Sequence, residues 1–122
     1  MSEESDFFEA RERWSYTTFG DRAERSAEGP LKHLRKEVVE ALETLWCRDN
    51  LVFTPNSPNY DKELLEELVD CTFLVQDAVS RAGFTYEEFL SACWAKLEKN
   101  RRRKWGPASS REPVEHLREE ET

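Results

Sequence analysis

Two pairs of acidic residues at helical spacing are the residues of this chain best suited to chemistry. Glu37 and Glu40 are three positions apart, and Glu67 and Asp70 repeat that spacing in the next long helical segment. On a helix, such residues lie on neighbouring rows, about 5–6 Å apart at Cβ. Two helices packed together could bring the pairs face to face, where four carboxylates stay ionised only if cations are present. Oxygen ligands of this kind favour Mg²⁺ or Mn²⁺.

A third polar group suits a polyphosphate. Lys96, Asn100 and Arg103 are spaced i, i+4, i+7, which places them on one face of a helix. The surrounding basic residues also have a structural interpretation, because cations complement the dipole at a helix C-terminus. Asn100 fits that interpretation less well, since Asn is a poor helix former. The acidic pairs have an ordinary interpretation too, as solvated charge with Lys36 and Glu40 forming an i,i+4 pair.

The apolar periodicity predicts an all-α protein, a compact bundle of three main helices and a short N-terminal helix. The N-terminal helix is expected to be capped by Ser5 or Asp6. The main helices are expected from Pro30 to about Trp46, from about Asp61 to "RAGF" at 81–84, and from a capping box at Thr85 and Glu88 to about Lys104. The expected core stripes are Leu31, Leu34, Val38, Leu42 and Leu45, then Leu64, Leu65, Leu68, Thr72, Val75 and Val79.

Length and charge narrow the class of protein. The 122 residues predict a single domain, 1–122, with a core at about 6–106 and a mostly extended acidic tail at 107–122. A net charge of -8 argues against nucleic-acid and anionic-membrane partners. The acidic N-terminus does not resemble a signal peptide, so we expect a cytoplasmic protein, in the host cytoplasm if it is phage-encoded. Cys47, Cys71 and Cys93 have no CxxC spacing and are expected to be buried, reduced thiols.

The order of these motifs resembles a known family. KExxE at 36–40, ExxD at 67–70 and KxxxNxxR at 96–103 are similar to motifs of the MazG-type all-α nucleoside triphosphate pyrophosphohydrolases. The flanking words "WSYTTFG", "GPLKHLRKE", "RAGF", "KLEKNRRRKWG" and "PVEHLR" resemble the phage and bacterial dATP/dGTP diphosphohydrolase group, the MazZ group. The resemblance covers about residues 8–118. Lys36 departs from the broader EExxE pattern, which puts a third metal ion in doubt.

The resemblance implies hydrolysis of dGTP and dATP to the monophosphate and pyrophosphate, with two to three Mg²⁺ or Mn²⁺ ions per site. It implies a homo-oligomer, commonly a tetramer built as a dimer of dimers. The implied metal ligands are Glu37, Glu40, Glu67 and Asp70, and the implied phosphate-binding residues are Lys96, Asn100 and Arg103. Among these we expect Glu40, Glu37 and Lys96 to be catalytic, with Glu40 as the base that accepts the proton of the attacking water.

Base recognition is expected to fall to the N-terminal segment and the end of the last helix. Trp14, Phe19 and Trp105 can stack on a purine, while Ser15 and the backbone around Gly20 can read its edge. The three aromatics have an equally strong interpretation as core or subunit-interface residues.

Three further side chains have expected roles of their own. We expect His33 to lie beside a ligand or on the surface, and Asp77 to form a structural ion pair with Arg81. His116 could reach a phosphate from the tail.

Three functions remain open on the sequence. The first is nucleotide-pool control by a phage or bacterial deoxypurine triphosphate pyrophosphohydrolase, which in some phages supplies dGMP for 2-aminoadenine DNA. The second is a housekeeping pyrophosphohydrolase for another or a damaged nucleotide. The third is a non-catalytic, acidic helical interaction module.

Overall fold

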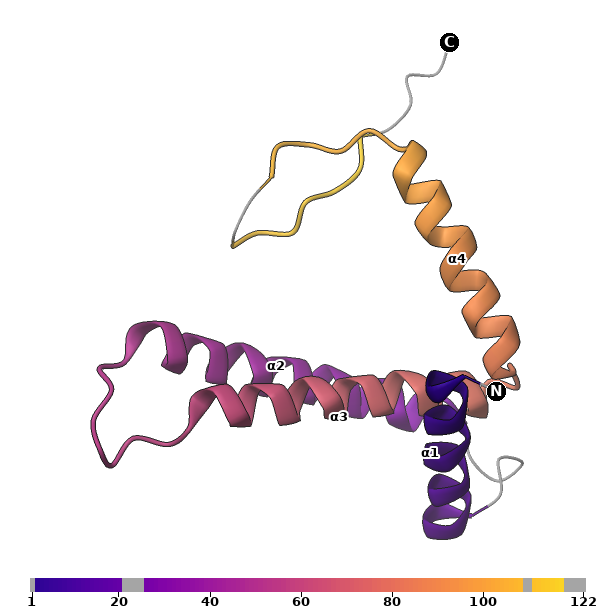
Figure 1. Cartoon of the computed structure of the whole chain (residues 1–122), viewed down its shortest axis with the longest axis horizontal. Helices are drawn as coiled ribbons and strands as arrows, with labels where there is room; N and C mark the ends of the chain where they lie inside the picture. The colour runs from indigo at the N-terminus through magenta and orange to yellow at the C-terminus, as the bar shows by residue number, and fades with distance from the viewer. Residues whose placement is uncertain (1, 21–25, 109–110, 118–122) are drawn as a thin grey trace. The chain divides into compact units, whose positions relative to one another are not determined.

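The computed structural model describes residues 2–20, 26–108 and 111–117, and in these ranges the protein is all-α. The helices are α1 (Glu3–Phe19), α2 (Glu28–Asn50), α3 (Tyr60–Arg81) and α4 (Tyr86–Arg102) (Figure 1). Within the described ranges the only β-type pairing is one isolated bridge. The predicted architecture of three main helices after an N-terminal one is confirmed. Over these same ranges, no helix combines the length and the apolar character that a membrane span needs.

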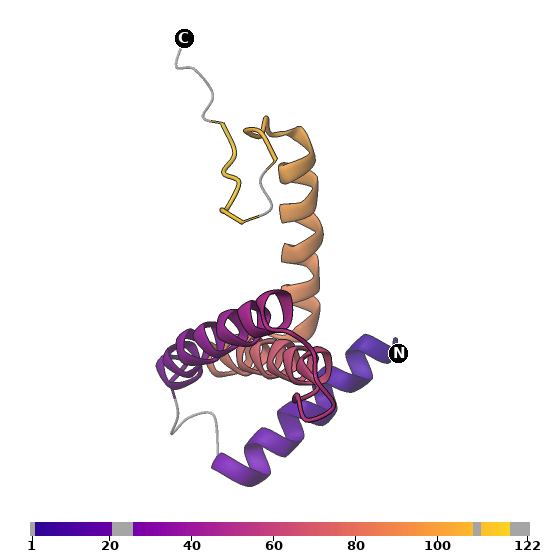
Figure 2. The same cartoon turned by 90° about the vertical axis from the view of Figure 1, so that its left-hand side faces the viewer.

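The chain divides into two compact units, residues 1–86 and residues 87–122. In the first unit, α2 and α3 run antiparallel and side by side, joined by the loop at 51–59 (Figures 1 and 2). Helix α1 crosses this pair near the end where α2 begins and α3 ends. The second unit contains most of α4 and the segment that follows it.

Helix α1 begins earlier than predicted. Its N-cap is Ser2, whose Oγ accepts a hydrogen bond from the Ser5 N–H at 3.1 Å. Acidic residues fill the first turn, where they complement the positive end of the helix dipole. The prediction of Ser5 or Asp6 as the cap was wrong, because Ser2 already satisfies the first turn and Ser5 is buried within the helix. The helix ends at Gly20, which has a φ of 95°.

The long helices agree with the predicted boundaries to within a turn. Pro30 lies in the first turn of α2. Helix α2 extends one turn past Trp46, and the side-chain amide of its last residue, Asn50, donates to the Trp46 carbonyl. Helix α3 begins after Asn59, whose side chain accepts from the Lys62 N–H. Helix α4 begins directly after Thr85, where the capping box places it, and ends at Arg102.

The side chains between α2 and α3 differ from the predicted core. Two of the predicted metal ligands, Glu37 and Glu67, are among the side chains that are shielded from solvent there. The shielded positions are Leu34, Glu37, Ala41 and Thr44 on α2, and Leu64, Glu67, Cys71, Leu74 and Ala78 on α3. Much of the predicted stripe is instead exposed: Leu31, Val38, Leu42, Leu65, Leu68 and Val75, which we call the apolar face. The core prediction was therefore only partly right, since the helices meet along a row offset by about one residue from that stripe.

Helix α1 packs on α3 largely through aromatic rings. Phe8 is 2% exposed and its ring lies 5.0 Å from that of Tyr86, the last residue of the first unit. Phe7 lies 5.5 Å from Phe73 of α3. These contacts hold the N-terminal half of α1 in place, and the candidate site residues follow in its C-terminal turns.

The described part of the C-terminal segment turns back on itself within the second unit. The Gly106 N–H donates to the Glu115 carbonyl, and the Leu117 N–H donates to the Lys104 carbonyl. The rings of Trp105 and His116 meet edge to face at 5.7 Å. The tail was predicted to be mostly extended; its residues 109–110 and 118–122 lie outside the described ranges.

The cysteines are all free thiols, as predicted, but their expected burial was wrong. Cys47 and Cys71 are half-buried and Cys93 is exposed. Cys93 is exposed because it lies on a face of α4 that none of the described residues of its own unit covers.

Candidate active site

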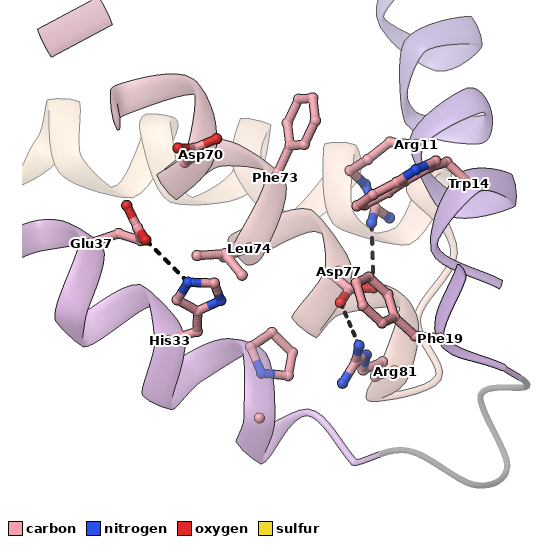
Figure 3. Close-up of a pocket in the computed structure, with 12 residues that line it drawn as sticks. Arg11, Trp14, Phe19, His33, Glu37, Asp70, Phe73, Leu74, Asp77 and Arg81 are labelled. Atoms are coloured by element: carbon pink, nitrogen blue, oxygen red, sulfur yellow. Dashed lines mark hydrogen bonds and ion pairs between the residues drawn. The ribbon is translucent and has the colours of Figure 1, made fainter. Parts of the chain in front are cut away.

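A cavity of about 350 Å³ lies where α1, α2 and α3 meet (Figure 3). Its lining includes Glu37 and Asp70, two of the predicted metal ligands, and Trp14 and Phe19, two of the predicted base-binding residues. The remaining lining residues are Arg11, Gly29, Pro30, His33, Phe73, Leu74, Asp77 and Arg81. The structure therefore brings together, in one cavity, residues that sequence reasoning assigned to opposite ends of a nucleotide.

The acidic end of the cavity lies between α2 and α3. The Glu37 side chain is 15% exposed and its Oε1 lies 3.0 Å from Nε2 of His33. His33 thus sits beside a predicted ligand, as expected. Glu67 faces Thr44, whose hydroxyl donates to Oε1 of Glu67 at 2.5 Å. Of the four predicted metal ligands, Glu67 and the exposed Glu40 do not line this cavity.

The Cys71 thiol reports how close the acidic side chains are. Its pKa is raised above the reference value of 9.0, first by burial and then by the negative charges of Glu37, Asp70 and Glu67. Carboxylates from both helices therefore act on this thiol. Over the described residues, however, no group of three or more His, Cys, Asp or Glu side chains is arranged to hold a metal ion.

The chemistry of these donors nevertheless fits a hard cation. Oε2 of Glu67 is buried and has no hydrogen-bond partner within the described residues. A buried, unpaired carboxylate oxygen is costly unless something compensates its charge. Glu37 and Asp70, whose charges act with that of Glu67 on the Cys71 thiol, would add carboxylate oxygens of the kind that Mg²⁺ and Mn²⁺ take.

The aromatic end of the cavity is formed by the C-terminal turns of α1. The rings of Trp14 and Phe19 meet at 5.5 Å with an interplanar angle of 88°, and both line the cavity. Gly20 closes the helix, and its N–H donates to the Tyr16 carbonyl. This N–H is therefore already engaged within the helix.

Ser15 lies behind the cavity wall, at 1% exposure. Its hydroxyl donates to Oδ1 of Asp77 at 2.8 Å, so this side chain faces a carboxylate of α3. The predicted ion pair is also present, with Nη2 of Arg81 2.9 Å from Oδ2 of Asp77. Sequence reasoning assigned that pair correctly.

Sequence reasoning missed the rest of this network. Arg11 is 4% exposed; its Nη1 lies 3.4 Å from Oδ1 of Asp77 and its Nη2 donates to Oγ of Ser80 at 3.1 Å. Ser80 in turn donates to Glu12. The available signal was position alone: Arg11 follows Phe8 by three residues and precedes Ser15 by four, on the buried face of α1.

Two of the phosphate-binding candidates, Lys96 and Asn100, lie on α4 in the second unit, and the third, Arg103, follows the last residue of that helix. Lys96 and Asn100 line an open hollow of about 570 Å³ with Phe89, Ala92, Cys93 and Leu97. The Arg103 guanidinium donates to the Asn100 side-chain oxygen at 3.3 Å, which places all three predicted residues close together. Trp105 also belongs to this unit, and its Nε1 donates to the Asn100 carbonyl at 3.0 Å.

Comparison with known proteins gives one family. A family model described as dATP/dGTP pyrophosphohydrolase matches residues 55–122, more than half of the chain. The matched range includes Glu67, Asp70 and the α4 residues, whereas Glu37 and the Trp14–Gly20 segment lie before it. Comparison with curated proteins gives no match, and neither does comparison with solved structures. The chain belongs to the dATP/dGTP pyrophosphohydrolase family and is a nucleoside triphosphate pyrophosphohydrolase.

Proposed function

We propose that this enzyme hydrolyses dATP and dGTP to the nucleoside monophosphate and pyrophosphate. The cavity between α1, α2 and α3 carries the proposal, because it holds acidic oxygens at one end and two aromatic rings at the other. A deoxypurine triphosphate has matching parts, a charged phosphate chain and a flat two-ring base. The family's description names the same two substrates.

Metal dependence is part of this proposal. Glu37, Glu40, Glu67 and Asp70 would hold two to three Mg²⁺ or Mn²⁺ ions, and the unpaired oxygen of Glu67 supports this assignment. Such ions, when bound, polarise a phosphoryl oxygen and acidify a water molecule. The exposed Glu40 would have to turn towards its neighbours for all four carboxylates to contribute.

Other side chains would bind the phosphates and accept the proton of the attacking water. Lys96, Asn100 and Arg103 supply cationic and amide donors to the phosphates. This is supported by the hollow that Lys96 and Asn100 share and by the hydrogen bond from Arg103 to Asn100. Glu40 accepts the proton of the attacking water. The negative charge of Glu37 attracts the metal ions that would acidify this water.

The aromatic residues would hold the base. Trp14 and Phe19 stack on it beside the end of α1 at Gly20, and Trp105 remains a third candidate for stacking. A two-ring base buries more surface against an aromatic wall than a one-ring base does. We therefore expect purines to be preferred over pyrimidines.

We further propose that the enzyme acts as a homo-oligomer. The apolar face of α2 and α3 is exposed, with Leu42 at 60% and Leu65 at 64%. When two helices pack antiparallel, the residue directly after each contacting residue points to the same side of the pair on both helices. The apolar face is therefore continuous, and a second copy of this chain, with the same face, would bury it.

The biological setting would be control of deoxypurine triphosphate levels in a phage or a bacterium. Hydrolysis of dATP and dGTP there would lower both pools, and the dGMP formed could supply 2-aminoadenine DNA synthesis. The alternative of a housekeeping enzyme for another nucleotide differs only in its preferred base.

The test is a panel of the four dNTPs with Mg²⁺, in which products are separated by ion-exchange chromatography. We expect pyrophosphate and the monophosphate as first products, with dGTP and dATP turned over faster than dCTP and dTTP. Lys96→Ala should lower this turnover more than it lowers Mg²⁺ binding. Orthophosphate and a diphosphate as first products, or a pyrimidine preference, would contradict the proposal.

A further inference from the structure

The floor of the α1–α2–α3 cavity contains a carboxylate and a guanidinium side by side. Asp77 and Arg81 line the cavity next to Phe19 and Trp14, at the end away from Glu37 and Asp70 (Figure 3). Asp77 is 8% exposed and its carboxylate is held between Arg11 and Arg81. A base stacked against the aromatic rings would have its edge within reach of this pair.

The hydrogen bonds of Asp77 leave room for one more donor. Oδ1 accepts from both Ser15 and Arg11, at 2.8 and 3.4 Å. Oδ2 accepts, among the described residues, from Arg81 alone. Because a carboxylate offers about four acceptor positions, Oδ2 retains one lone pair for a ligand N–H.

Arg81 has donors to match. Its Nη2 contacts Asp77 and its Nη1 donates to the Ser26 carbonyl at 3.4 Å, while its Nε has no partner among the described residues. The guanidinium carries five N–H donors in total. The cavity floor therefore presents an acceptor beside a donor.

Purine edges carry the complementary pattern. Adenine offers N7 as an acceptor beside its 6-amino donor, and guanine offers O6 as an acceptor beside its N1–H donor. We propose that Asp77 and Arg81 read the base edge of the substrate: Asp77 accepts from the amino or imino N–H, and Arg81 donates to the adjacent acceptor. This inference rests on the proposed function, and it gives Asp77 the edge-reading role that Ser15 was expected to have.

The role of Ser15 follows from the same geometry. Because Ser15 and Arg11 together hold Oδ1, they fix the plane of the Asp77 carboxylate and leave Oδ2 towards Arg81. Ser15 is thus a positioning residue for Asp77.

The experiment removes single groups from the substrate and from the protein. Dissociation constants are measured by calorimetry for dAMP, for its analogue without the 6-amino group, and for 7-deaza-dAMP, so that no hydrolysis is needed. The wild-type protein should bind both analogues about tenfold or more weakly than dAMP, the range for a hydrogen bond to a charged group.

Two variants then assign the groups. In Asp77→Asn the side chain keeps one acceptor oxygen, and the guanidinium groups of Arg11 and Arg81 compete for it. Because no acceptor is then left for the 6-amino group, the variant should bind dAMP and the analogue without this group equally well. It should keep the penalty for 7-deaza-dAMP. Ser80→Ala is the matched control, because Ser80 accepts from Arg11 in the same network but does not line the cavity. It should keep both penalties.

The outcomes are separable. Equal wild-type binding of dAMP and the analogue without the 6-amino group would overturn the inference, as would an Asp77→Asn variant that retains the wild-type penalty. Loss of all nucleotide binding by folded Asp77→Asn, with Ser80→Ala intact, would assign Asp77 to structure and also overturn it. Failure of the proposed function appears separately, as no pyrophosphate from dATP or dGTP.

Discussion

At the scale of single residues, buried polar atoms distinguish the candidate site from ordinary helix surface. Oε2 of Glu67 is buried without a hydrogen-bond partner among the described residues, and the Asp77 carboxylate, in the cavity wall on the same helix, is held by two arginines. Exposed acidic residues such as Glu66 carry the same charge at little cost, because water solvates them. Burial therefore distinguishes the candidate-site carboxylates Glu67 and Asp77 from exposed carboxylates of the helix surface.

The first residue-scale prediction concerns metal binding. Mg²⁺ or Mn²⁺ should raise the melting temperature of the wild-type protein, since a ligand at about a hundred times its Kd stabilises by about 2.7 kcal/mol. Glu67→Gln should abolish that rise because it removes a carboxylate from the donor set. Glu66→Gln removes the same charge from an exposed position of α3 and should retain it. A wild-type melting curve that millimolar metal leaves unchanged would favour the non-catalytic interaction module.

The second residue-scale prediction concerns pH. The raised pKa of Cys71 favours its protonated thiol, so its thiolate should form, and its alkylation become fast, only above pH 9.0. Iodoacetamide labelling across a pH series, read by peptide mass spectrometry, measures the rate at Cys71. A Cys71 labelling profile with its midpoint below pH 9.0 would contradict the effect of burial and of the acidic side chains on this thiol.

At the scale of elements, helix ends are where local chemistry determined the structure most directly. The end of α3 has two characteristic bonds, from the Gly83 N–H to the Ser80 carbonyl and from the Phe84 N–H to the Val79 carbonyl. Gly83 has a φ of 95°, a conformation that L-residues rarely adopt. This end holds Arg81 and Asp77 in the last turns of the helix.

The element-scale prediction is a graded series at Gly83. A Cβ at Gly83 meets nothing within 4 Å, so Gly83→Ala tests backbone conformation alone. We expect a loss of about 1 kcal/mol in the free energy of unfolding, measured by urea denaturation. Gly83→Asn should lose less, because Asn tolerates the left-handed region. A stability order with Asn below Ala would contradict a conformational origin.

At the scale of the whole molecule, the apolar face of α2 and α3 is exposed among the described residues of its unit. Large apolar patches on an exposed surface mark interaction sites. None of the residues of this face lines the cavity, so a second copy could cover the face without covering a cavity residue.

The molecular-scale prediction is that Leu42→Glu weakens self-association. A carboxylate at this position would be desolvated in a subunit interface, so the variant should have a lower mass in light scattering than the wild type at the same concentration. Lys32→Glu is the control, because it also adds a carboxylate to an exposed position of α2, away from the apolar face. A wild-type protein that is monomeric throughout the micromolar range would exclude the oligomer.

The sequence by itself determined the helices and their ends. Pro30 in a first turn, Gly83 after a last turn and the Thr85 capping box each act within a few residues, so their effect can be read locally. The spacing of Glu37 and Glu40, and of Glu67 and Asp70, is likewise a local property of each helix. The same holds for Lys96 and Asn100 of α4, which are four residues apart and line the same hollow.

Only the tertiary structure decided which faces meet. The apolar stripes predicted as core remain largely exposed, while Glu37 and Glu67 lie between α2 and α3, because helix pairing depends on the combined surfaces of two elements. Arg11 and Ser15 lie 66 and 62 residues before Asp77 in sequence, yet both donate to its carboxylate. Periodicity assigns each of them to a face of its own helix, but it cannot tell which residue of another helix that face will meet.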